Sequence, residues 1–304
     1  MANQKVVGKD LEFWFNGIES PIISVKPSES FGTEDSTDTA TPTDGKDFEV
    51  ILAERSFTVE QNFYTPDGAE ISTGNLVIGN RYKVTAAGAT LIGAGYVVGQ
   101  IFEATSALTM DVDDKVVPLG TKITGKTMAL SFNSLDVPLT DVDISVNYDE
   151  LDTTDTETTG DGTEYVTSRA ERESKASIIM RSEDADLLTT NPTSAATILT
   201  FATGQTFTGS SVPISKEITD ESNGVSKVDY TFKWKGAPTE LSCGLAAAVE
   251  HAFKIIFKRG TSTNKEITGN AIITQKSITV SRKGIAKISY TFRINGTPTY
   301  AVAN

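Results

Sequence analysis

The sequence predicts an all-β chain with one or two short helices, built as two domains of the same plan plus a small inserted β module. Three observations support this prediction. Thr, Ser, Val, Ile and Gly are plentiful, whereas strong helix formers are few. Apolar residues alternate with polar ones in short runs, which is the period of half-buried strands. Two segments of the chain each occur twice, and a repeat at a fixed offset indicates one structural unit used again.

The longer repeat relates residues 125–181 to residues 8–64 at a constant offset of 117 positions, without a gap. Phe132-Asn133, for example, falls on Phe15-Asn16. Chance does not hold register over about fifty residues, so these two segments, here called the A repeats, are interpreted as one structural unit.

A shorter pair, here called the B repeats, relates residues 208–239 to residues 268–299 at an offset of 60 positions. Tyr230-Thr231-Phe232 falls on Tyr290-Thr291-Phe292. The chain therefore reads A, insert, A, B, B.

Each A repeat is predicted to be a hairpin, a long acidic loop and a return strand. In the first copy, residues 11–15 alternate like a strand and Asn16-Gly17 is a hairpin turn signal. Residues 21–25 read as a second strand, whose first proline suits a sheet edge. Residues 28–46 hold almost nothing to bury and predict a mobile loop, after which alternation resumes at Phe48.

The second A repeat predicts the same plan, with its acidic loop at 149–164. The first B repeat and its approach predict three strands, at 197–201, 211–219 and 225–235. Helical patterns are confined to two places. Residues 183–188 predict a short helix that ends near Asn191-Pro192. Leu241 to Phe257 is the strongest helical segment, because its apolar residues share one face and Gly260 supplies a stop.

Residues 70–121, between the A repeats, have no counterpart around the second A repeat. Glycines separate short strand-like runs such as Tyr82-Lys83-Val84 and Tyr96-Val97-Val98. These runs predict a small β module on the surface, because an insertion is tolerated where it leaves the core alone.

A helical segment precedes each B repeat, which favours a nested topology. One domain would then consist of residues 1–65 with 241–304, and the other would consist of residues 125–240. A sequential arrangement, which pairs the first A with the first B repeat and the second A with the second B repeat, satisfies the same counts. Both topologies remain open at this point.

The sequence offers little for catalysis or for cofactor binding. A single cysteine, Cys243, excludes an internal disulfide framework, and a single histidine, His251, leaves no partner for a Cys/His zinc site. No nucleophile elbow or phosphate loop is present, and nothing singles out a carboxylate pair for glycoside hydrolysis. The carboxylates of 149–164 lack the spacing of a helix-loop-helix calcium site. We expect no enzymatic activity, no cofactor and no metal.

The net charge of −13 is unevenly spread, since residues 205–298 carry +6 and the remainder therefore carries −19. The acidic excess argues against tight nucleic-acid binding, whereas acidic A and basic B repeats could attract each other between subunits. No segment approaches the ~18 apolar residues that a membrane helix needs. The amino terminus has no apolar signal core, so we expect a chain that folds in a cytoplasm and does not enter a membrane.

The A repeat carries Glu-Leu-Asp-Thr-Thr-Asp-Thr at 150–156 and Arg-Ala-Glu-Arg at 169–172. With these motifs it resembles the amino-terminal half of long-tailed, siphophage-like phage tail tube proteins. The B repeat carries Lys-Glu-Ile-Thr at 216–219 and Val-Asp-Tyr-Thr-Phe-Lys-Trp-Lys-Gly-Ala-Pro-Thr at 228–239, and it resembles their carboxy-terminal half. The resemblance covers most of the chain except 66–124, and the insert resembles small β modules that decorate phage structural proteins.

The resemblance implies two β-sandwich tube domains, each with a flanking helix, that assemble into rings, and rings that stack into a tube conducting DNA. The protein would then be a structural component of the virion tail, made in the host cytoplasm. A doubled domain implies three chains per ring with pseudo-six-fold symmetry. The implied partners are further copies of the chain, other tail proteins, and DNA that passes without specific binding. Negative side chains along the bore would repel phosphate.

The acidic loops of the A repeats are the candidate contacts between subunits, because they could become ordered against the next ring. The candidate residues are Asp35, Asp38, Asp44, Tyr148, Asp152, Asp155, Asp161 and Glu164.

Two other function classes stay open. The chain could be a capsid decoration or tail-completion protein that uses the same β units without a continuous tube. It could also be a glycan-binding surface adhesin, which a secretion signal would favour.

Overall fold

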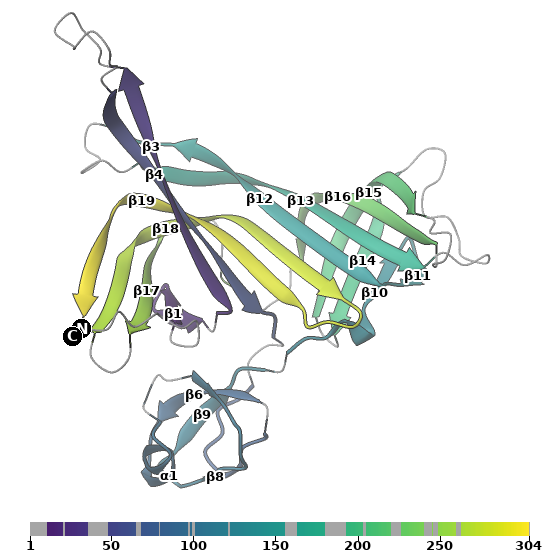
Figure 1. The fold of residues 1–304 in the computed structure, drawn as a ribbon. Coiled ribbons are helices and arrows are strands. Elements are labelled where there is room, and N and C mark those ends of the chain that lie inside the picture. The colour runs from purple at the N-terminus through teal and green to yellow at the C-terminus, as the bar shows by residue number, and fades with distance from the viewer. Residues whose placement is uncertain are drawn as a thin grey trace, which may run out of the picture.

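The computed structural model describes residues 11–20, 22–35, 48–64, 68–78, 80–96, 98, 101–120, 122–155, 163–179, 193–202, 205–219, 226–239, 245, 249–259 and 263–303. Within these residues nearly every element is a strand (Figure 1). The helical elements among them are α1 (Ala89–Gly93) and the 3-10 turn η2 (Gly125–Thr127). The predicted all-β class is confirmed. No helix in the described part of the chain has the length and apolar character needed to cross a membrane.

Seven strands form a first structural unit, here called unit 1. They are β1 (Leu11–Phe15), β2 (Ile18–Ser20), β3 (Ser24–Asp35), β4 (Phe48–Asn62), β17 (His251–Arg259), β18 (Thr263–Ser281) and β19 (Lys287–Ala303). Their hydrogen-bonding order is β2-β1-β17-β18-β19-β4-β3. Unit 1 thus combines the first A repeat with the last B repeat.

Seven further strands form unit 2. They are β10 (Ala129–Phe132), β11 (Leu135–Pro138), β12 (Asp141–Asp152), β13 (Tyr165–Ile179), β14 (Ala195–Ala202), β15 (Gln205–Thr219) and β16 (Lys227–Thr239). Their order, β11-β10-β14-β15-β16-β13-β12, repeats that of unit 1 strand for strand. The bounds of β12 and β13 are those of β3 and β4 shifted by the 117-residue offset. The second A repeat pairs with the first B repeat, which is the grouping of the nested topology.

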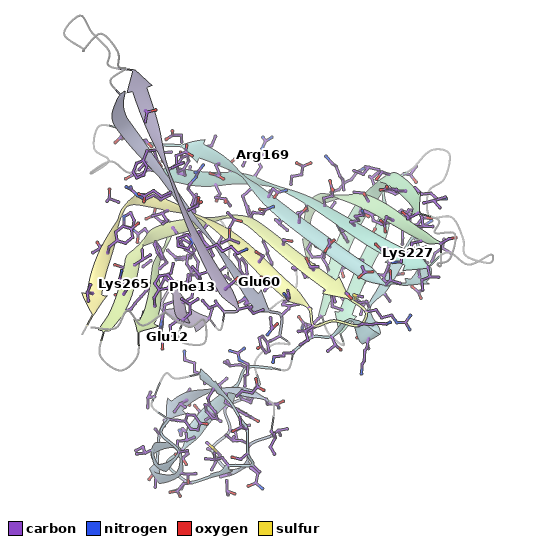
Figure 2. All side chains as sticks on the ribbon, in the orientation of Figure 1. Glu12, Phe13, Glu60, Arg169, Lys227 and Lys265 are labelled. Atoms are coloured by element: carbon purple, nitrogen blue, oxygen red, sulfur yellow. The ribbon has the colours of Figure 1, made fainter. Side chains whose placement is uncertain are left out.

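One further ladder joins the two units into a single sheet. The first half of β18 pairs with β17, and its second half pairs with β12 of unit 2 (Figure 1). One contiguous hydrophobic cluster contains buried residues of both units. Phe13 lies fully buried in this cluster, whereas Arg169, Lys227 and Lys265 lie at the surface (Figure 2). We refer to the β12–β18 ladder as the internal joint.

Tight turns start both A repeats. Asn16 and Gly17 have φ values of 52° and 70°, and Asn133 and Ser134 have φ values of 49° and 66°. Positive φ at both central residues is the backbone of a two-residue hairpin turn, which Asn and Gly accept most readily. The predicted turn at Asn16-Gly17 is confirmed.

The insert has a core of its own. Its elements are β5 (Gly74–Asn75), β6 (Arg81–Ala86), α1, β7 (Ile101–Glu103), β8 (Thr109–Met110) and β9 (Lys115–Pro118). Tyr82, Leu91 and Val116 are buried in a hydrophobic cluster separate from that of the units. The fully buried carboxylate of Asp114 accepts hydrogen bonds from the amides of Gly88 (2.5 Å), Leu91 (3.3 Å) and Asp111 (3.0 Å). These bonds fix the start of α1, which has no side-chain cap of its own.

The helix predicted over Leu241–Phe257 is wrong where the structure describes that segment, because His251–Arg259 is strand β17. Phe253 and Ile255 are buried while Lys254 between them is only partly so, which is a period of two. The helical pattern and the strand pattern share several apolar residues. The aromatic and β-branched content of 253–257, together with pairing to β1 and β18, favours the strand.

The predicted loops begin later than the composition indicated. Residues 28–35 and 149–152 are strand, since β3 and β12 continue to Asp35 and Asp152. Their backbone groups pair with β4 and β13, so polar side chains do not prevent strand formation there. The remainder of the first loop (36–47) and the helix predicted at 183–188 lie outside the described residues.

Candidate functional site

No group of three or more His, Cys, Asp or Glu side chains in the described part of the chain could hold a metal ion. The distinctive feature is instead the internal joint between two equivalent units. Residues 141–147 of β12 pair antiparallel with residues 275–281 of β18. Ile144 lies opposite Ile278 at the centre of this ladder.

The internal joint has a buried apolar face. On β12 this face carries Val142, Ile144 and Val146, all fully buried. Ile144 and Ile278 are each only 1% exposed. Burial of a side chain of this size contributes about 1.5–3 kcal/mol. The joint is therefore part of the hydrophobic core rather than a surface contact.

The backbone bonds of the joint alternate along β12. The Arg282 amide donates to the Thr140 carbonyl oxygen at 2.8 Å. Because successive residues of a strand direct their N–H and C=O groups to opposite sides, residues 142, 144 and 146 direct theirs toward β18.

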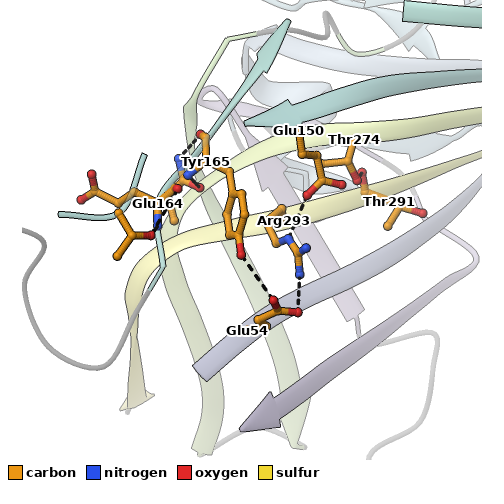
Figure 3. A network of polar contacts seen from close by, with 9 residues as sticks. Glu54, Glu150, Glu164, Tyr165, Thr274, Thr291 and Arg293 are labelled. Carbon is orange, nitrogen blue, oxygen red and sulfur yellow. Dashed lines mark hydrogen bonds and ion pairs between the residues drawn. The ribbon is translucent and has the colours of Figure 1, made fainter. Parts of the chain in front are cut away.

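Beyond the ladder, a polar network connects the far ends of β12 and β13 to unit 1 (Figure 3). Arg293 of β19 bonds Glu54 of β4 at 3.1 Å and Glu150 of β12 at 3.0 Å. Its guanidinium also lies 4.5 Å from the ring centroid of Tyr165 of β13. One cation thus connects two strands of unit 1 with two strands of unit 2. Burial alone would lower the pKa of Arg293, but the hydrogen bond and the charges of these partners outweigh it and raise that pKa.

Reciprocal hydrogen bonds align β13 with β19. The Tyr165 amide donates to the Asn295 Oδ1 at 3.1 Å, and the Asn295 Nδ2 donates to the Tyr165 carbonyl at 3.0 Å. The Gly296 amide donates to the Thr163 carbonyl at 2.9 Å. Gly296 has φ of 68°, a conformation that glycine adopts without strain.

The two strand edges that would form a second joint of this kind have no strand partner among the described residues. The counterpart of β12 is β3, which pairs with β4 alone. The counterpart of the second half of β18 is the second half of β15. On the β14 side of β15, pairing ends at Ser211. Ile218, the counterpart of Ile278, is accordingly 52% exposed.

The central ion pair of the network is also repeated. Lys233 and Glu171 of unit 2 are the counterparts of Arg293 and Glu54, and they form an ion pair at 2.6 Å. The hydrogen bond and charge of Glu171 raise the pKa of Lys233. The positions that correspond to Glu150 and Tyr165 are Thr33 and Phe48, on the β3–β4 hairpin. That hairpin extends away from unit 2 of its own chain (Figure 1).

The structure describes four of the eight candidate residues on the β12 side of unit 2, past residue 147, where the internal joint ends. Tyr148 of β12 packs partly buried against the shared core. Asp152 lies at the end of β12, where hydrogen bonds from the side chain and amide of Thr154 lower the pKa of its carboxyl group. The backbone of Glu164 bonds Thr153 and Thr154. Asp155 is exposed.

Of the other four, Asp35 ends β3, opposite Phe48 of β4. Asp38, Asp44 and Asp161 lie outside the described residues. The structure therefore brings the described ends of the second acidic loop against unit 1 of the same chain, through Glu150 and Thr163. The end of β3 belongs to the hairpin with an open edge.

Sequence reasoning missed the apolar residues of the joint and its central cation, Arg293. A signal for the joint exists in the differences between the A repeats. Val142, Ile144 and Val146 stand where the first repeat has Val25, Pro27 and Glu29. A face with three aliphatic residues in one copy, and with a proline and a charged residue at two of those positions in the other, indicates which edge is covered within the chain.

Comparison with protein-family models finds no match for this chain, and comparison with curated proteins finds none either.

Proposed function

We propose that this chain is the repeating subunit of a long-tailed phage tail tube, in which closed rings of the protein stack and conduct DNA. The observation that carries the proposal is the internal joint between two equivalent units, together with one open copy of each of its two edges. A chain that already forms this contact once within itself presents the parts to form it again with another copy.

Such a contact is heterologous, because one surface of each copy meets a different surface of the next. Heterologous contacts form a ring if their rotation closes, and a helical filament if it does not. Three chains would supply six units to a ring. The alternation of internal and intermolecular joints then gives pseudo-six-fold symmetry, as the sequence resemblance implies.

The charge of the chain suits a conduit. The net charge is −13, whereas proteins that grip nucleic acid neutralise phosphates with lysine and arginine. Carboxylates facing a bore repel DNA and let it pass. The polar content of the hairpin ends suits contact with neighbouring rings and other tail proteins.

The test is the assembly state of the purified protein across a concentration series, measured by sedimentation velocity with electron microscopy of the same samples. We expect trimeric rings with a central hole, and stacked tubes at higher concentration. A protein that remains monomeric at all concentrations contradicts the proposal and favours a capsid decoration or tail-completion role.

A further inference from the structure

We propose that the β3–β4 hairpin of one chain docks on β15 and β16 of a second copy, with Ser28 opposite Glu217. The partner is another copy of the same chain, so this inference rests on the proposed function and specifies its contact.

The register follows from the repeat offsets. In the internal joint, Ser145 lies opposite Ser277. The 117-residue offset takes Ser145 to Ser28, and the 60-residue offset takes Ser277 to Glu217. The other opposed pairs are then Lys26 with Thr219, Pro27 with Ile218, Glu29 with Lys216, and Ser30 with Ser215.

The side chains at these positions fit one another. Pro27 and Ile218 are both exposed and apolar, and they occupy the place of the buried Ile144–Ile278 pair. Glu29 lies opposite Lys216, which places opposite charges across the ladder. Pro27 also lines an open hollow of about 230 Å³ together with Phe57 and other residues of unit 1. Ile218 of the second copy would cover its rim.

Phe31 supplies an aromatic anchor near the end of the hairpin. It is 52% exposed, although its counterpart Tyr148 packs partly buried against the core that the two units share. Docking in the equivalent register would pack Phe31 against unit 2 of the next chain, and large aromatic side chains dominate the energetics of such contacts.

The same docking brings the hairpin to the Lys233–Glu171 pair. Thr33 would lie where Glu150 bonds Arg293 in the internal joint. A threonine in place of the third charged partner makes this part of the intermolecular contact less strongly charged than the internal one.

A second copy is the occupant that the chain specifies, for two reasons. The ladder it would form already exists once in the structure, with the same order of strands on each side. The bulge in β15 between Pro213 and Ser215 also recurs at the equivalent place in β18, between Ile273 and Gln275. The β15 edge thus enters the joint with the same backbone irregularity as its internal counterpart.

The test is disulfide formation between engineered cysteines, in a Cys243→Ser background, across a concentration series in which ring formation is followed in parallel by electron microscopy. The test variant combines Ser28→Cys with Glu217→Cys. Both side chains are exposed. Their counterparts Ser145 and Ser277 form a non-hydrogen-bonded pair, because residues 144 and 146 direct their backbone groups toward β18 and residue 145 does not. Opposed residues of this type have Cα atoms about 4.5 Å apart, which is within disulfide range. We expect reducible dimers and trimers on a denaturing gel.

Four control variants fix the interpretation. Ser145→Cys with Ser277→Cys should link within one chain and leave a monomer, because it tests the same geometry in the internal joint. Ser30→Cys with Thr219→Cys is four residues out of register and should not link. Cysteines at both positions should form disulfides when each is combined with the residue opposite it in the proposed register. These matched variants are Ser30→Cys with Ser215→Cys, and Lys26→Cys with Thr219→Cys.

The outcomes separate the two proposals. If rings form but the Ser28/Glu217 pair links no faster than the out-of-register pair, the docking register is wrong and the proposed function stands. Linked chains that never close into rings support the docking and overturn the ring. Monomers without links overturn both.

Discussion

The internal joint is covered within the chain, whereas the two edges that correspond to it are open, and their side chains differ accordingly. In the internal joint, Val142, Ile144 and Val146 are buried against β18. On the open β3 edge the corresponding residues are Val25, Pro27 and Glu29. A face that is covered in every folded chain can be fully apolar. A face exposed in the free subunit carries a charge and a proline, which limit unspecific strand pairing.

The cation beside the internal joint, Arg293, also differs from its counterpart Lys233 in the number of its partners. Arg293 has two carboxylate partners and an aromatic ring, and it connects the units permanently. Its counterpart Lys233 has Glu171 as its ion-pair partner. Arginine presents a planar fork of donors to several acceptors at once, whereas lysine presents a single charge. Under the proposed assembly, folding depends on the internal joint and ring formation depends on the open edges that correspond to it.

The largest expected effect separates folding from assembly. Ile278→Ala should lower the free energy of unfolding by about 2–5 kcal/mol, because it leaves a cavity in the core. Ile218→Ala, at the equivalent open position, should change the stability of the dilute monomer by less than about 0.5 kcal/mol while weakening assembly. Urea unfolding of both variants measures the difference. If both variants lose the same free energy of unfolding, Ile278 and Ile218 are not the buried copy and the open copy of one site.

A smaller difference is expected for the cations. Arg293→Met should destabilise the monomer by about 1–2 kcal/mol, because it leaves two carboxylates without their partner, partly screened by solvent. Lys233→Met should leave thermal unfolding of the monomer unchanged, because its ion pair is exposed. If the lysine variant is the less stable of the two, the network in Figure 3 does not hold the units together.

Pro27 sharpens the comparison at the open edge. Its position corresponds to Ile144, whose amide faces β18, so the intermolecular ladder lacks one donor that the internal ladder has. Pro27→Val should add one hydrogen bond to the intermolecular ladder, worth about 0.5–1.5 kcal/mol, which strengthens each contact roughly two- to twelve-fold and lowers the concentration for half-assembly. Sedimentation across a dilution series measures this shift. Unchanged assembly would show that β3 is not in a ladder with the next chain.

The smallest expected effect is on the pH dependence of stability, through Asp152 at the end of β12. Hydrogen bonds from the side chain and amide of Thr154 hold the pKa of Asp152 below its ordinary value. A carboxyl group with a lowered folded-state pKa stabilises the protein above its unfolded pKa, and this contribution is lost as pH falls through the folded value. Asp152→Asn should therefore lower the melting temperature slightly near neutral pH, and the difference should shrink as pH falls below the ordinary pKa of an aspartate. A difference that grows on acidification would contradict the assignment.

The repeats made most of the fold predictable, because identical spacing at 117 residues requires identical strands. β3 and β12, and likewise β4 and β13, have the bounds that this offset relates. Local pattern failed where it was ambiguous, as at 251–257, where a helical and a strand period fit the same apolar residues. It also failed at 28–35, where pairing with β4 holds polar residues in a strand.

The joint itself could not be read from either repeat alone, because it pairs the second A repeat with the last B repeat across the two units. Composition directed attention to the acidic loops, whereas the buried contact is made by Ile144 and Ile278. Only the strand order shows that a second set of the same edges lies open.

The most direct test of the account is the density of an assembled ring at a resolution that separates strands. The account predicts a sheet that continues without interruption from β3 of one chain into β15 of the next, alternating around the ring with the internal β12–β18 ladder. Rings in which both edges face solvent, or in which they pair with other strands, would contradict it.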